Sequence, residues 1–92
     1  MKLRYALGDV LRELRLEKKF TLRQLSVKAG VSLGYLSEIE RGSKEISSEL
    51  LSSIAKAIEV PLHQIIIETG HRIQISSLDT YESVERELTV AI

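Results

Sequence analysis

The sequence predicts an all-α protein with five helices and a C-terminal extension, on three observations. Apolar residues recur at intervals of three and four along most of the chain, which is the spacing of one face of a helix. Residues that cap helices, such as serine, threonine and glycine, stand at the ends of these apolar runs. The 92 residues include no cysteine. We therefore expect one domain held by packing rather than by disulfides, in a reducing compartment such as the cytoplasm.

Two helices are expected in the first third of the chain. The first covers about residues 6–18, and its apolar stripe consists of Leu7, Val10, Leu11 and Leu14. Thr21 and Gln24 have the spacing of a capping box, in which each side chain bonds the backbone N–H of the other residue. A second helix is therefore expected from this box to Ala29, where Gly30 supplies the positive φ of a helix end.

A third helix is expected after a turn of only three residues, 30–32. Ser32 is its N-cap, the helix covers about residues 33–41, and Gly42 ends it. So short a turn makes the second and third helices cross steeply, and apolar residues must fill the crossing. The residues expected to face inward from the third helix are Leu36 and Ile39.

Two shorter signals predict the fourth and fifth helices. Ser47 caps the fourth helix, whose apolar stripe consists of Leu50, Leu51, Ile54, Ala55 and Ile58. Pro61 begins a short fifth helix, because a proline at the first helical position loses no helical hydrogen bond. The residues expected to anchor this helix are Leu62, Ile65 and Ile66. The domain, residues 1–70, is expected to end with it.

Beyond Gly70 the pattern changes, and residues 71–92 are expected to form an extension. Residues 72–75 alternate between polar and apolar, which favours an extended segment. A capping box at residues 79–82 favours a last helix over about residues 80–90. Because five helices already close the core, the apolar residues of the extension are expected to form the interface of a homodimer. They are Ile73, Ile75, Leu78, Tyr81, Val84 and Leu88. The alternative is that the extension folds back on its own domain.

The charges are distributed unevenly although their sum is zero. Residues 1–44 hold ten lysines and arginines against five acids, a net charge of +5. Residues 45–92 hold three against eight, a net charge of −5. A basic half predicts a face that attracts a polyanion, and the alternative is a chance asymmetry on a solvated surface. No apolar run approaches the roughly 20 residues of a membrane span, so no membrane partner is expected.

These features together resemble the five-helix, lambda-repressor-like domain of Cro/C1-type (XRE-family) helix-turn-helix regulators. The matching runs are TLRQLSVKAGVSLGYLSEIERG and SSELLSSIAKAIEVPL. Within that family, ALGDVLRELR and VPLHQI are similar to the ClgR type, the regulators of Clp protease genes. The resemblance implies a sequence-specific regulator that binds near-palindromic double-stranded operator DNA as a homodimer through the recognition helix 33–41. RNA polymerase is a further candidate partner, and activation of Clp protease genes is the implied role.

The resemblance also assigns roles to single residues. Arg15 and Glu40 match a largely buried salt bridge, so they are expected to be scaffold rather than DNA contacts. The positions expected to contact DNA lie at the start of the second helix, on the exposed face of the third, and in the loop after it. They are Thr21, Arg23 and Gln24, then Ser32, Leu33, Gly34, Tyr35, Ser37, Glu38 and Arg41, then Gly42, Ser43 and Lys44. The first and last groups, with Arg41, are expected on phosphates, Tyr35 on the DNA backbone or a thymine methyl, and the others toward bases.

Two of these positions depart from the family pattern. Many relatives have glutamine or another hydrogen-bonding residue where this chain has Leu33 and Gly34. Neither can make paired hydrogen bonds to a base, although Leu33 can touch a thymine methyl and Glu38 can accept from cytosine N4. Part of the selectivity is therefore expected from DNA shape and bending.

Several charged residues have an alternative role that does not involve DNA. Glu38 can be a surface acid, Arg41 a helix-end cation, and the Lys18–Lys19 pair a solvated helix end. Lys2 and Arg4 can form an arm along the duplex or a frayed terminus.

Neither an enzyme nor a cofactor or metal site is expected. His63 and His71 lie eight residues apart, with no cysteine to complete a zinc site. No nucleophile–base arrangement and no glycine-rich phosphate loop can be identified. The alternative function is that of a protein-interaction module, such as an antitoxin or adaptor, whose binding surface is the acidic second half.

Overall fold

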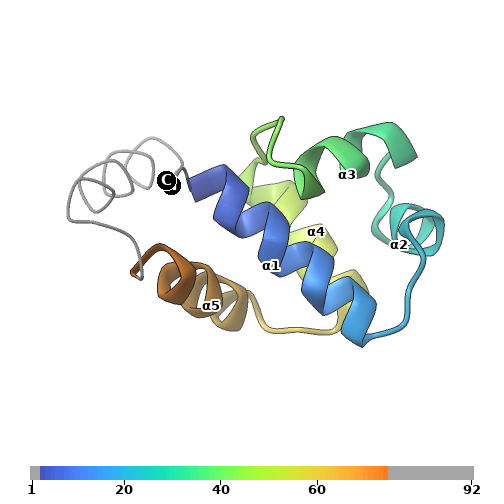
Figure 1. Ribbon diagram of the computed structural model, residues 1–92. Coiled ribbons are helices and arrows are strands. Elements are labelled where there is room, and N and C mark those ends of the chain that lie inside the picture. Colours follow the sequence, from blue (N-terminus) through green and yellow to red (C-terminus); the bar gives the residue numbers. More distant parts are fainter. Residues whose placement is uncertain (1–2, 75–92) are drawn as a thin grey trace.

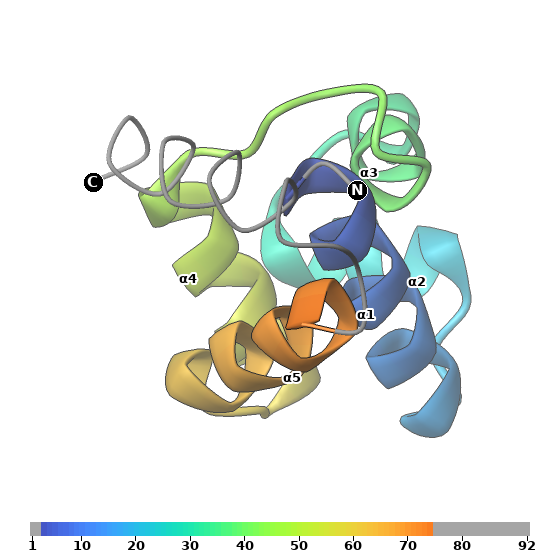
Figure 2. The same cartoon turned by 60° about the vertical axis from the view of Figure 1, so that its left-hand side comes forward.

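The computed structural model describes residues 3–74, which form five α-helices (Figure 1). They are α1 (Leu3–Glu17), α2 (Leu22–Ala29), α3 (Leu33–Glu40), α4 (Ser48–Ile58) and α5 (Leu62–Gln74). α1 packs on α3 and α5, α2 packs on α3 and α4, and α4 also contacts α5. Figures 1 and 2 show α3 along one edge of the bundle, with α1 between it and α5.

The helix ends are set by the capping residues that the sequence predicts. Thr21, Ser32 and Ser47 each accept a hydrogen bond from the backbone N–H three residues later, at 3.0, 3.2 and 3.1 Å. The capping box is complete, because the Gln24 side chain accepts from the Thr21 N–H at 2.8 Å. Gly30 ends α2 with a φ of 70°. The predicted starts of α2, α3 and α4 are thus confirmed.

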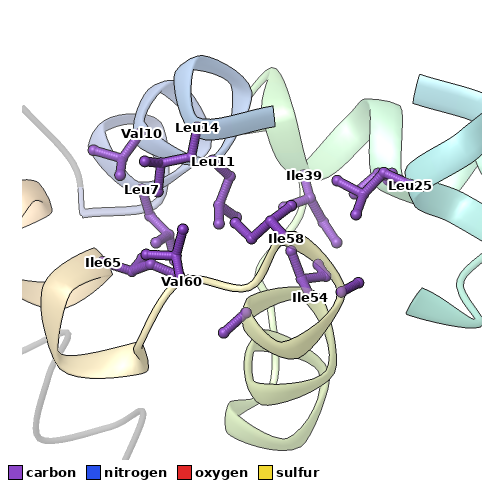
Figure 3. Close-up of a cluster of buried hydrophobic side chains, with 13 residues drawn as sticks. Leu7, Val10, Leu11, Leu14, Leu25, Ile39, Ile54, Ile58, Val60 and Ile65 are labelled. Carbon is purple, nitrogen blue, oxygen red and sulfur yellow. The ribbon is translucent and has the colours of Figure 1, made fainter. Parts of the chain in front are cut away.

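The hydrophobic core draws side chains from all five helices (Figure 3). Its largest fully buried members are Val10, Leu11, Leu25, Leu36, Ile39, Ile54, Ile58 and Ile65. Burial of each such side chain contributes about 1.5–3 kcal/mol relative to exposure. Within residues 3–74 no single helix is long and apolar enough to cross a membrane. α4 and α5 reach that length together, across a bend of 105°.

The prediction of a short fifth helix followed by an extended segment is wrong, because α5 is not short. It continues through Gly70 to Gln74, so residues 72–74 are helical and not extended. Two contacts explain the added turn. Ile73 is buried, with only 6% of its surface exposed, and the Arg72 guanidinium pairs with the carboxylate of Glu13 on α1. The alternation of polar and apolar residues covers only four positions, and these two contacts outweigh the preference for an extended segment that it indicates.

Three more differences concern the start of α1 and the burial of two isoleucines. α1 begins at Leu3 rather than near residue 6. Ile66, predicted to anchor α5 in the core, is 50% exposed. Among the residues predicted for a dimer interface, Ile73 is buried in its own domain. The others, Ile75, Leu78, Tyr81, Val84 and Leu88, lie outside the described residues, as does the helix expected near 80–90.

Candidate nucleic-acid interface

The inner side of α3 is held firmly against the domain. Leu36 is fully buried and Ile39 is 2% exposed. At Gly8 of α1 the two helix backbones touch, since a Cβ atom there would lie 2.5 Å from the carbonyl oxygen of Ile39 and 2.7 Å from that of Glu40. Only glycine leaves room for this approach. An isolated glycine in a helical run is the sequence signal for such a contact.

Arg15 connects α1 to α3 and to the start of α2. Its Nε and Nη2 atoms donate to the two carboxylate oxygens of Glu40, at 2.7 and 2.9 Å. Both side chains are buried, with 10% and 6% exposure. The Nη1 atom donates to the carbonyl oxygen of Phe20 at 2.9 Å, immediately before the N-cap of α2. One guanidinium therefore sets the position of α3 relative to the N-terminus of α2, which makes this pair part of the scaffold.

The outer side of α3 brings together residues predicted to contact DNA. Ser32, Gly34 and Arg41 are exposed. The partly exposed members of this face are Leu33, Tyr35, Ser37 and Glu38. The Arg41 guanidinium donates to the Ser37 hydroxyl one turn earlier, so its charge lies over this face. No other described helix covers α3 on this edge of the bundle (Figures 1 and 2).

Hydroxyl groups of the predicted interface also bond backbone groups of the protein. The Ser32 hydroxyl accepts from the Tyr35 N–H at 3.2 Å. The Tyr35 hydroxyl donates to the carbonyl oxygen of Glu45 at 2.9 Å, and the Ser43 hydroxyl donates to that of Glu38 at 3.1 Å. Tyr35 therefore joins α3 to the loop that follows it. The sequence pattern does not reveal this role, because the hydroxyl's partner is a backbone group ten residues away.

The residues assigned to phosphates lie at the start of α2 and in the loop after α3. Thr21, Arg23 and Gln24 are exposed at the start of α2. The first N–H groups of a helix have no intrahelical partner and suit an anion. In the loop, Lys44 is exposed, and Gly42 has a φ of 76° that favours glycine.

The fold and this face define a class of protein. Figure 1 shows α2 nearly end-on and α3 from the side, so the pair crosses steeply, as in a helix-turn-helix. The helix-turn-helix family profile matches residues 11–65, and the chain belongs to this family, in its XRE type. The transcriptional regulator ClgR of Mycobacterium tuberculosis is 56% identical over 69 residues. The match covers 75% of this chain and 62% of that protein, so the chain spans less than two thirds of its relative's length.

Solved structures agree with the sequence relatives. The clp gene regulator ClgR from Corynebacterium glutamicum superposes with a TM-score of 0.79 at 42% identity, covering 96% of this chain and 92% of that one. The restriction-modification controller protein C.AhdI from Aeromonas hydrophila has a TM-score of 0.65 at 26% identity, covering 66% and 92%. The chain thus belongs to the XRE type of the helix-turn-helix family and is similar to ClgR regulators in both sequence and fold.

Proposed function

We propose that the chain binds near-palindromic operator DNA as a homodimer, with α3 of each subunit in a major groove. The two grooves lie about one helical turn (~34 Å) apart. The observation that carries this proposal is that the two sides of α3 differ in how they are packed. Its inner side is fixed by Leu36, Ile39 and the Arg15–Glu40 pair, and its outer side is not covered by another described helix. The likeness to the clp gene regulator of C. glutamicum supports clp genes as the targets, with activation as the proposed mode.

Selection of bound fragments from random duplex DNA, followed by footprinting of one selected fragment, tests this function. We expect an enriched site with two related half-sites. We also expect affinity that falls steeply with salt, because most of it comes from phosphate contacts. A chain that shifts no duplex even at low salt contradicts the proposal and favours a protein-interaction module.

Alanine variants of the interface are expected to separate affinity from specificity. Arg41→Ala or Lys44→Ala should weaken binding to selected and random duplexes alike, by about 3- to 10-fold. Either variant should also make the slope of log K against log salt less steep, by about 0.9 for each bound subunit. Glu38→Ala should change which sequence is preferred. Fluorescence anisotropy titrations measure both effects. Lys56→Ala on α4 removes the same charge from a helix outside the proposed interface and serves as the control. Selection results unchanged by Glu38→Ala would reject its base-reading role.

We further propose that the homodimer interface combines α5 with the C-terminal extension. Ile66 and Ile67 of α5 are 50% and 52% exposed, and a second copy of the chain would remove this apolar surface from water. Ile73 is already buried in its own domain, so residues 75–88 must supply the remaining apolar contacts.

Truncation after Gln74 keeps all five helices, including the buried Ile73 and the Arg72–Glu13 pair. We expect it to weaken dimerisation at least about 10-fold, measured by sedimentation equilibrium. A truncated chain that dimerises like the full chain rejects the role of the extension. In the full chain, Ile66→Glu should also weaken the dimer because it buries an unpaired charge, and an unchanged dimer would reject the role of α5.

A further inference from the structure

One cation at the start of α1 has no role in the function proposed above. Arg4 lies in the first turn of α1, so it is neither an extended arm nor a frayed end. Its neighbour Tyr5 packs on Gly42, where a Cβ atom would lie 2.9 Å from the Tyr5 Cα. The start of α1 is therefore in direct contact with the loop that carries Lys44, a candidate phosphate ligand.

The Arg4 charge is positioned but only weakly neutralised. Its Nη1 atom lies 3.9 Å from Oε1 of Glu45, which is longer than a hydrogen bond. The Glu45 side chain is 85% exposed, so water and salt screen the pair. The Arg4 guanidinium lies 5.5 Å from the centroid of the Tyr5 ring. Its Nε atom is buried and has no hydrogen-bond partner within the described residues.

The position of Glu45 makes it a competitor for any anion that approaches this loop. Its backbone carbonyl is held by the Tyr35 hydroxyl at 2.9 Å, so the residue stays close to α3. It follows Lys44 directly in the chain, and its carboxylate partly offsets the cations of the loop.

We propose that Arg4 binds a phosphate of the duplex beside this loop and that Glu45 holds the guanidinium only in the free protein. A phosphate offers two acceptor oxygens to an arginine fork, which the 3.9 Å contact with Glu45 does not provide. When α3 docks in the groove, the phosphate takes the place of the carboxylate. This inference rests on the proposed function, because it extends the same DNA-contacting surface.

Substitutions at Arg4 test the contact. Arg4→Gln is expected to weaken binding to operator and random duplexes about 3- to 10-fold. It should also make the slope of log K against log salt less steep by about 0.9 for each bound subunit. Arg4→Lys keeps the charge and should restore most of the slope. Lys56→Ala, the matched loss of charge on α4, should change neither. Wild-type affinity and slope in Arg4→Gln overturn the inference.

A double-mutant cycle with Glu45 tests the exchange. Glu45→Gln is expected to tighten binding about 2- to 5-fold when Arg4 is present, and clearly less in the Arg4→Gln background. Equal gains in both backgrounds overturn the exchange. Thermal unfolding of each variant verifies that folded proteins are compared. Absence of wild-type binding is a failure of the proposed function, whereas normal wild-type binding with an unaffected Arg4→Gln is a failure of this inference alone.

Discussion

Replacing Glu40 by alanine is expected to lower the free energy of unfolding by about 3–5 kcal/mol. The Arg15 guanidinium would lose the hydrogen bonds of 2.7 and 2.9 Å to the carboxylate and remain a buried, unpaired charge. A small domain has a total stability of about 5–15 kcal/mol, so this loss would be a large fraction of the total. Urea denaturation followed by circular dichroism measures the change.

Two variants distinguish burial of the charge from loss of an ion pair as such. Glu13→Ala breaks the exposed pair with Arg72 and is expected to cost less than about 1 kcal/mol. The joint change Arg15→Met with Glu40→Leu removes both charges and should recover much of the stability. Recovery is expected to be incomplete, because the carbonyl of Phe20 loses its donor. A loss below about 1 kcal/mol in Glu40→Ala contradicts the expected cost of a stranded charge.

Gly8→Ala is expected to destabilise the domain by about 1–3 kcal/mol, the cost of overpacking a tight contact. Alanine is otherwise favoured over glycine inside a helix by about 1 kcal/mol, so the sign of the effect is informative. The added Cβ would lie 2.5 Å from the carbonyl oxygen of Ile39, and a backbone atom can give way only if α1 and α3 separate. The same movement should weaken DNA binding. Thermal unfolding and anisotropy titrations measure the two effects.

Gly70→Ala provides the matched control for Gly8→Ala. Gly70 lies inside α5, and a Cβ atom built there meets nothing within 4 Å. This variant is expected to be more stable than the wild type by about 0.5–1 kcal/mol. If Gly8→Ala is as stable as Gly70→Ala, the backbones of α1 and α3 are not in the close contact described.

The parts of the fold that local chemistry determines were predicted well. The starts of α2, α3 and α4 follow from caps that bond a backbone N–H only three residues away, which a sequence pattern displays directly. The Arg15–Glu40 pair is different, because its members are 25 residues apart. No periodic pattern in the sequence predicts this pair, and it was expected only from the resemblance to a family.

The parts that depend on contacts between distant elements were missed. The last turn of α5 is held by Ile73 in the core and by the Arg72–Glu13 pair, and neither contact is visible in a four-residue alternation. Ile66 was expected inside because it is apolar, yet it is half exposed. The bond from Tyr35 to the loop depends on where that loop passes. The direct DNA contacts remain predictions from the family.

The three hydrogen bonds of Arg15 have a consequence for how a duplex must fit. They join Glu40 at the end of α3 and Phe20 at the start of α2 to a single rigid group. In the proposed complex, the start of α2 faces a phosphate and α3 lies in the groove. The distance between them is therefore fixed by the protein. Any mismatch has to be absorbed by the nucleic acid, whose stiffness varies with sequence. Base pairs that the protein never touches thus enter the affinity through the ease with which they deform.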